Sequence, residues 1–191
     1  ELERFVKDSV EKNLQIAMHA IGERAIEQLL TCYEKVRPLR HRIEHAECIK
    51  DEQIERVAKK RVILSMQPAF VGAFHELYIK RFGSKRAMEL NPFRKIIEKG
   101  IKPAFGSDSP VTPINPLRGI KCATNHPNEK LSISLDEAIK GFTEWASYAV
   151  FKENDYGKLA KGYFADITVV DKSFTKILAV YKKGKVIKIS K

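Results

Sequence analysis

Four short apolar segments, each followed by a stretch with helical periodicity, divide most of the chain. They lie at residues 14–22, 39–46, 61–68 and 101–110. Apolar runs of this length that end in glycine, proline or polar residues are typical of buried strands. Alternation of strand and helix predicts βαβ units around a parallel sheet, and right-handed crossovers place every strand's carboxyl end on the same side. We therefore expect an α/β fold.

Helical periodicity predicts helices at residues 1–12, 25–36, 51–60, 91–100 and 134–151. Capping signals support the last two of these helices. Ser134 and Glu137 have the spacing of a capping box, and Asn91 and Gly100 stand where an N-cap and a C-terminal glycine belong. Residues 69–90 have no regular pattern and predict a long excursion after the third strand.

The tail of the chain changes character. Its runs "KGYFADITVVD" and "KILAVYKKGKVIKIS" are rich in Ile, Val and Thr, and "KKGK" has the composition of a turn between two strands. This pattern predicts a small antiparallel β unit after the α/β part. We therefore divide the chain into residues 1–158 and residues 159–191.

Composition argues against several classes of protein. Of the 191 residues, 43% are hydrophobic, which is enough for a core, but no apolar run approaches the roughly 18 residues that a membrane span needs. The three cysteines are widely spaced and odd in number, which favours a cytoplasmic protein without disulfides. Because basic and acidic residues are interleaved, we read the net charge of +11 as a charged surface typical of heat-adapted proteins, and nucleic-acid binding is the weaker alternative.

Polar side chains stand at the carboxyl ends of the four expected strands. They are His19, His45, Gln67 and Asp108, and catalytic groups in parallel sheets and barrels lie at these carboxyl ends. Two imidazoles and a carboxylate suit Zn²⁺ and similar divalent ions. Taken singly, each residue also has a structural interpretation, because a lone histidine on an apolar strand is usually part of the core and Asp108 before Ser-Pro could form a turn.

The motifs "HAIGERA", "RHRIEHAE", "SMQP", "FGSDSPV" and "GKLAKGYFADITVVD" resemble the amidohydrolase superfamily over roughly residues 14–185. The branch is amidohydrolase family 3, which includes N-substituted formamide deformylases and archaeal members called exoenzyme regulatory proteins. The resemblance implies a TIM-like (β/α)₈ barrel with a small β-sandwich. The four strands would be barrel strands five to eight, so that this chain would be the carboxy-terminal half of the barrel, and the tail would supply sandwich strands.

The resemblance also implies a metal site. His19 looks like the strand-five histidine ligand, His45 like the strand-six histidine ligand, and Asp108 like the strand-eight aspartate that binds metal and handles the proton of the attacking water. We expect zinc, with one or two ions in the whole protein. The His-x-His pair of the family's first strand and any strand-four ligand are absent from this sequence, so the site here would be incomplete.

The function that follows from the resemblance is hydrolysis of a non-peptide C–N bond, in an amide or formamide, by metal-activated water. This chain would be a fragment of that hydrolase, because it has no initiator methionine, begins within a helical pattern and is too short for a whole barrel of about 250 residues. Its exposed sheet edge predicts self-association or pairing with the missing half. The alternative is a catalytically inactive module with a regulatory or assembly role.

Three further residues are candidates for contact with a small amide-like substrate. They are Gln67 at the barrel mouth, His75 on the excursion after the third strand, and Arg118, which could meet an anionic group. His126 is expected to be a solvated loop residue.

Within "RHRIEHAE", strand alternation puts His41, Ile43 and His45 on one face, which we expect to point into the barrel. His41 would lie some 13 Å from His45 at strand rise, too deep to share its metal, and is interpreted as structural. Arg42 and Glu44 would point the other way.

Overall fold

Four parallel strands form one sheet in the order in which they occur along the chain, as the alternation of strand and helix predicted. In this computed structural model, which describes residues 1–189, they are β1 (Ala17–Ala20), β2 (Arg42–His45), β3 (Ile63–Met66) and β4 (Ala104–Phe105). The carboxyl ends of the strands therefore meet at one edge of the sheet, and β1 and β4 are its two outer strands.

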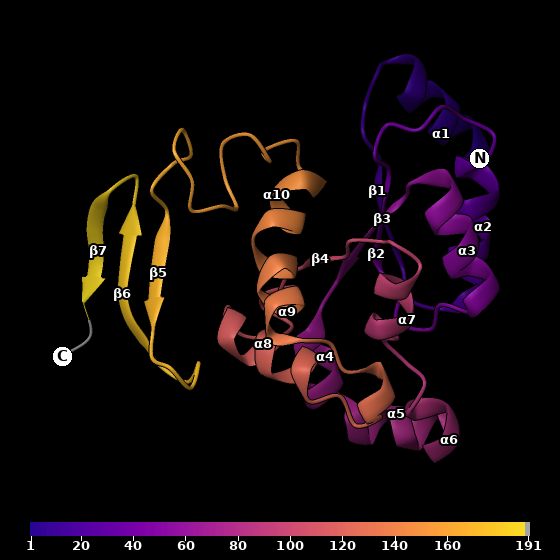
Figure 1. Cartoon of the computed structure of the whole chain (residues 1–191). Helices are drawn as coiled ribbons and strands as arrows, with labels where there is room; N and C mark the ends of the chain where they lie inside the picture. Colours follow the sequence, from indigo (N-terminus) through magenta and orange to yellow (C-terminus); the bar gives the residue numbers. More distant parts are fainter. Residues whose placement is uncertain (190–191) are drawn as a thin grey trace.

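Helices connect the strands and flank the sheet (Figure 1). They are α1 (Leu2–Glu11), α2 (Glu23–Tyr33), α3 (Asp51–Lys60), α4 (Pro68–Ala73), α5 (His75–Phe82), α6 (Ser84–Ala87), α7 (Phe93–Glu98), α8 (Pro116–Thr124), the 3₁₀ turn η1 (Glu129–Leu131), α9 (Leu135–Phe142) and α10 (Glu144–Ala149). The main core lies between the sheet and these helices, and Ile26, Ile43, Leu64 and Phe93 are among its buried side chains. No helix of the described residues is long and apolar enough to cross a membrane.

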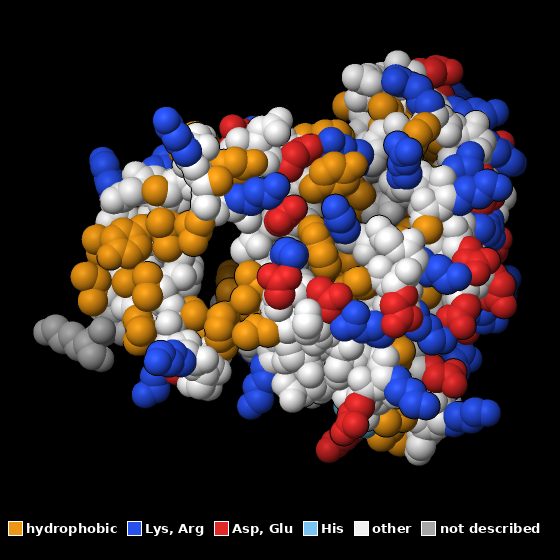
Figure 2. All heavy atoms as spheres, viewed as in Figure 1, with side chains coloured by type: hydrophobic (Ala, Val, Ile, Leu, Met, Phe, Trp, Pro, Cys, Tyr) orange, Lys and Arg blue, Asp and Glu red, His pale blue; other side chains and the backbone are white. Residues whose placement is uncertain are grey.

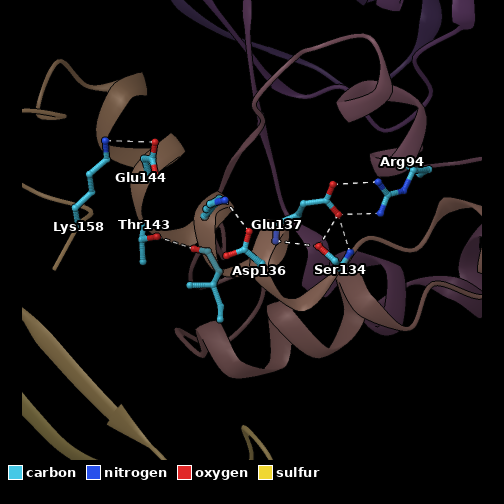
Figure 3. A network of polar contacts seen from close by, with 9 residues as sticks. Arg94, Ser134, Asp136, Glu137, Thr143, Glu144 and Lys158 are labelled. Carbon is cyan, nitrogen blue, oxygen red and sulfur yellow. Dashed lines mark hydrogen bonds and ion pairs between the residues drawn. The ribbon is translucent and has the colours of Figure 1, made fainter.

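The helix predicted over residues 134–151 is interrupted. Thr143 has φ −128° and ψ −89°, which no α-helix tolerates, and separates α9 from α10. Its hydroxyl donates to the carbonyl of Ile139 at 2.8 Å (Figure 3). The predicted capping box is confirmed, because the Ser134 hydroxyl accepts from the Glu137 N–H and the Glu137 carboxylate accepts from the Ser134 N–H. The sequence could not show the interruption, because the apolar pattern continues through it.

The predicted N-cap at Asn91 is wrong. Helix α7 begins at Phe93, and Asn91 has φ +52°, a left-handed conformation that no N-cap adopts. Its backbone N–H instead donates to the carbonyl of Glu47 at 2.8 Å. A contact between residues so far apart in the chain cannot be read from local capping rules.

The tail forms a second sheet, of the antiparallel kind expected. Its strands are β5 (Ile167–Val170), β6 (Ile177–Lys182) and β7 (Lys185–Ile189), paired in chain order. The predicted boundary after residue 158 falls in the irregular segment between α10 and β5. Apolar side chains on this sheet are exposed, among them Val186, Ile187 and Ile189, and Figure 2 shows hydrophobic side chains gathered on the tail at the left of the view.

Candidate metal centre

Two histidine rings meet at the carboxyl ends of β1 and β2. The ring centroids of His19 and His45 are 4.4 Å apart, with an angle of 66° between the ring planes. His19 is exposed, whereas His45 is only 7% exposed. The structure thus brings together the two histidines that the sequence predicted as metal ligands.

Strand pairing explains why His19 faces the open side of the sheet. In the parallel register, Ala17 lies beside Arg42 and His19 lies beside Glu44, and lateral neighbours on adjacent strands point to the same side. The exposed Ala17 and His19 mark this side as the one that faces away from the helix-covered core. We call it the inner face.

The prediction for the faces of β2 was therefore wrong. Arg42 and Glu44 lie on the inner face and form an ion pair between Nε and Oε1 at 2.7 Å. Ile43 is fully buried in the main core on the opposite face. His41 is buried and structural, as expected, with its ring stacked on Tyr33 at 5.0 Å and its Nδ1 atom accepting the Ile16 N–H.

His45 reaches its position because the strand's alternation stops there. His45 has φ +75° and the next residue, Ala46, has φ +52°. Left-handed conformations at two successive non-glycine residues cost energy and are concentrated at functional sites. The Ala46 N–H donates to the carbonyls of Ala20 and Glu44, at 3.0 and 3.1 Å, which fixes this turn.

A hydrogen bond from Gln67 determines which nitrogen of His45 is available. The Gln67 Oε1 atom lies 2.8 Å from His45 Nδ1, and Gln67 Nε2 donates to the carbonyl of Ser65 at 3.3 Å. Since the amide oxygen can only accept, His45 Nδ1 carries the proton, so that in the neutral ring the free lone pair lies on Nε2. Ligating histidines in metal sites are oriented in this way. Contact of Gln67 with substrate stays a prediction.

Asp108 is not joined to the histidine pair. It is exposed, has φ +52°, and its carbonyl accepts the Val111 N–H in a turn after β4. Within residues 1–189, no group of three or more His, Cys, Asp or Glu side chains lies close enough to hold one ion. Metal binding by His19, His45 and Asp108 together therefore stays a prediction.

Sequence reasoning missed a buried acid beside these residues. Glu47 is only 4% exposed, and the Tyr78 hydroxyl donates to its Oε2 atom. Burial raises the pKa of Glu47 above its ordinary value, whereas the hydrogen bond from Tyr78 acts to lower it. The negative charge of Asp108 also raises the pKa of this carboxyl group. The signal in the sequence was the motif "HAE", in which Glu47 follows the end of β2 by two residues.

Among the described residues, no hydrogen bond, ion pair or ring contact joins the remaining candidates to the histidine pair. His75 begins α5 and is half-buried, and its side chain has no hydrogen bond or ion pair among the described residues. Arg118 is exposed on α8, and within residues 1–189 its side chain has no ion pair. Their contact with substrate remains a prediction.

The expectation that His126 is solvated was wrong. Its side chain is buried, its Nε2 atom donates to the carbonyl of Leu90 at 3.0 Å, and its Nδ1 atom accepts the Asn128 N–H at 3.0 Å. Burial lowers the pKa of His126. Both ring nitrogens have hydrogen-bond partners, so His126 connects its own loop to the segment around Leu90.

The donor set fits a divalent metal ion. His45 offers Nε2 as a lone pair, and His19 offers a second imidazole from the neighbouring strand. Imidazole nitrogens suit zinc and other first-row divalent metals. Two imidazoles are too few for a closed site, so further ligands must join them.

Comparison with known proteins extends these observations. The profile of family 3, described as "Amidohydrolase family", matches residues 1–187. The putative amidohydrolase YtcJ of Bacillus subtilis is 38% identical over 88% of this chain and 34% of its own length. The N-substituted formamide deformylase of Arthrobacter pascens is 24% identical over 83% of this chain and 32% of its own length.

A solved structure agrees with this result. An uncharacterized metal-dependent hydrolase from Pyrococcus furiosus superposes with a TM-score of 0.75 and 29% identity, over 85% of this chain and 34% of that chain. The parallel sheet and its helices are thus the carboxy-terminal half of a TIM-like barrel, and the tail strands belong to the accompanying β-sandwich. The chain spans about a third of the length of the curated relatives it matches.

Proposed function

Because this chain belongs to amidohydrolase family 3, we propose that it is part of a metal-dependent hydrolase that cleaves a non-peptide C–N bond in an amide or formamide. The observation that carries the proposal is the pair of His19 and His45, with rings 4.4 Å apart and with Gln67 leaving His45 Nε2 free. The name of the Arthrobacter pascens relative, a formamide deformylase, supports this class of substrate.

In this proposal His19 and His45 hold the metal, for which we favour zinc, and Asp108 joins them in the whole protein. A bound divalent ion polarises the carbonyl of the substrate and lowers the pKa of water. Asp108 accepts the proton of the attacking water and passes it to the leaving nitrogen. Its exposed position at the end of β4, at the same edge of the sheet as both histidines, is compatible with this role.

The proposed activity belongs to the whole protein. The further ligands that the histidine pair requires come, in this proposal, from residues outside this chain. The free thiols of Cys32, Cys48 and Cys122 support a reducing, cytoplasmic setting.

The test uses the full-length protein, purified with zinc. We expect stoichiometric zinc and hydrolysis of N-substituted formamides or simple amides, and His45→Ala should lose both. His41→Ala is the matched control, because it removes a buried histidine that the proposal leaves out of the site. Full turnover by zinc-free His45→Ala protein would refute the assignment.

One observation favours a second candidate, a catalytically inactive module with a regulatory or assembly role. The described residues bring no three metal-binding side chains together. Under this alternative the full-length protein would bind no metal, or one weakly held ion, and would show no turnover.

A further inference from the structure

A chain of aromatic rings connects the excursion after β3 to the candidate metal centre. The Phe70 ring is stacked beside the His45 ring, with centroids 6.0 Å apart and 19° between the planes. Phe74 contacts Phe70 at 5.0 Å, and Tyr78 contacts Phe74 at 6.4 Å. Helices α4 and α5 therefore present one continuous aromatic edge, which starts at a proposed metal ligand.

Tyr78, the last of these three aromatic rings, contacts a residue that follows β2. The Tyr78 hydroxyl donates to Glu47 Oε2, and Glu47 lies two residues after His45. Both side chains are buried. A series of side-chain contacts through the three aromatic rings thus links His45 to Glu47, which is also two residues away along the backbone.

Glu47 also anchors the point where the excursion ends. Its carbonyl accepts the N–H of Asn91, just before α7. Cys48, the next residue, packs with Tyr78 and Leu90 in a small apolar cluster. The residues after His45 therefore hold the excursion in its middle and at its end.

The hydrogen bond between Tyr78 and Glu47 is shielded from water, because both side chains are buried. Hydrogen bonds gain strength where water is excluded. Without this donor, the buried Glu47 Oε2 atom would lose its partner, which is costly for a buried polar atom. The contact therefore favours one position of α5.

We propose that Glu47 and Tyr78 are positioning residues that fix α4 and α5 against the end of β2, so that Phe70 covers one side of the His45 ring and forms a wall of the substrate site. The wall is apolar and aromatic, so it favours substrates that carry an apolar group next to the scissile bond. The inference rests on the proposed function only where it names substrate. The position of α4 and α5 can be tested without any turnover.

The first test is hydrogen exchange of the full-length, zinc-loaded protein. In Tyr78→Phe, which removes only the hydroxyl, we expect backbone amides of residues 69–82 to exchange about tenfold faster or more, as for a buried polar atom left without its partner. The matched control is Tyr163→Phe, since the Tyr163 hydroxyl has no partner among residues 1–189. Exchange in Tyr78→Phe within twofold of wild type, or faster by the same factor throughout the protein, would overturn the proposal.

The second test separates positioning from general stability by kinetics. If the full-length protein hydrolyses an amide, Tyr78→Phe should raise KM several-fold for a substrate with a phenyl group and leave kcat within about twofold. A merely structural defect would lower the active fraction, and so kcat, with KM unchanged, and that result would contradict the proposal. Absence of any hydrolysis would count against the proposed function and leave the exchange result to decide this inference.

Discussion

The Nδ1 atom of His45 lies 2.8 Å from Oε1 of Gln67, and this one hydrogen bond fixes the tautomer of the ring. A reversed Gln67 amide would lose its bond to the Ser65 carbonyl, because its oxygen would then face that carbonyl, and two acceptors repel each other. Its NH2 group would also face the protonated Nδ1 of His45, and two donors repel each other. In the neutral ring the position of the lone pair on Nε2 is therefore determined by Gln67, the residue that follows β3.

Removal of this hydrogen bond should weaken metal binding. Gln67→Leu deletes the acceptor, and outer partners of this kind are worth about 10–100-fold in metal affinity. Competition with a zinc chelator on the full-length protein measures the effect. Gln67→Glu keeps an acceptor oxygen and serves as the control, with affinity nearer to wild type. Equal affinities for wild type and Gln67→Leu would contradict this role.

Close packing of α9 against β4 should make Gly141 intolerant of any side chain. A Cβ atom at Gly141 would overlap the ring of Phe105, and overpacking of this kind costs about 1–3 kcal/mol. Gly141→Ala should lower the free energy of unfolding by that amount in urea titrations. A Cβ at Gly22 would meet nothing within 4 Å, so Gly22→Ala should cost less. Equal stability of the two variants would show that the Phe105 ring moves freely.

Acid should weaken the contact that fastens α9 to α7. The Arg94 guanidinium bonds both oxygens of Glu137, at 3.0 and 2.8 Å (Figure 3). Burial alone would raise the pKa of Glu137, but Arg94 and Ser134 bring it below its ordinary value of 4.5. A carboxylate with a lowered pKa adds stability above the unfolded value, and this stability is lost as pH falls through the folded value.

Glu137→Gln should therefore lower stability at pH 7 and have less effect at pH 3. Urea unfolding of wild type and variant at the two pH values measures this difference. The opposite trend, with a larger effect at pH 3, would contradict the assignment of the lowered pKa to the Arg94 and Ser134 contacts.

The open strand edges predict association of residues 1–191 expressed alone. Each of β1 and β4 pairs with one strand only among the described residues, and unpaired edges attract other strands. Light scattering after size exclusion should reveal oligomers, and their mass should fall when the remaining part of the protein is co-expressed. A clean monomer of 21.8 kDa in dilute solution would contradict the prediction.

The sequence was sufficient where the controlling interactions are local. The apolar runs located all four strands, and the serine and glutamate three residues apart located the capping box at Ser134. The polar residues at the strand ends also identified the histidine pair, because parallel strands bring their carboxyl ends together.

The sequence was insufficient where a contact joins distant segments. Alternation in β2 could not decide which face is core, because that depends on the register with β1, where His19 lies beside Glu44. The role of Glu47 depends on Tyr78, 31 residues away. The buried position of His126 depends on Leu90, 36 residues away. Such partners follow from tertiary packing and have no signature in the local pattern.

The central claim is that His19 and His45 bind one metal ion, with His45 using Nε2. The direct measurement is anomalous diffraction at the zinc edge from crystals of the full-length protein. We predict one anomalous peak about 2.0–2.1 Å from His45 Nε2, with the Gln67 bond to Nδ1 intact. A peak that contacts neither histidine, or one next to His45 Nδ1 with Gln67 displaced, would contradict the claim.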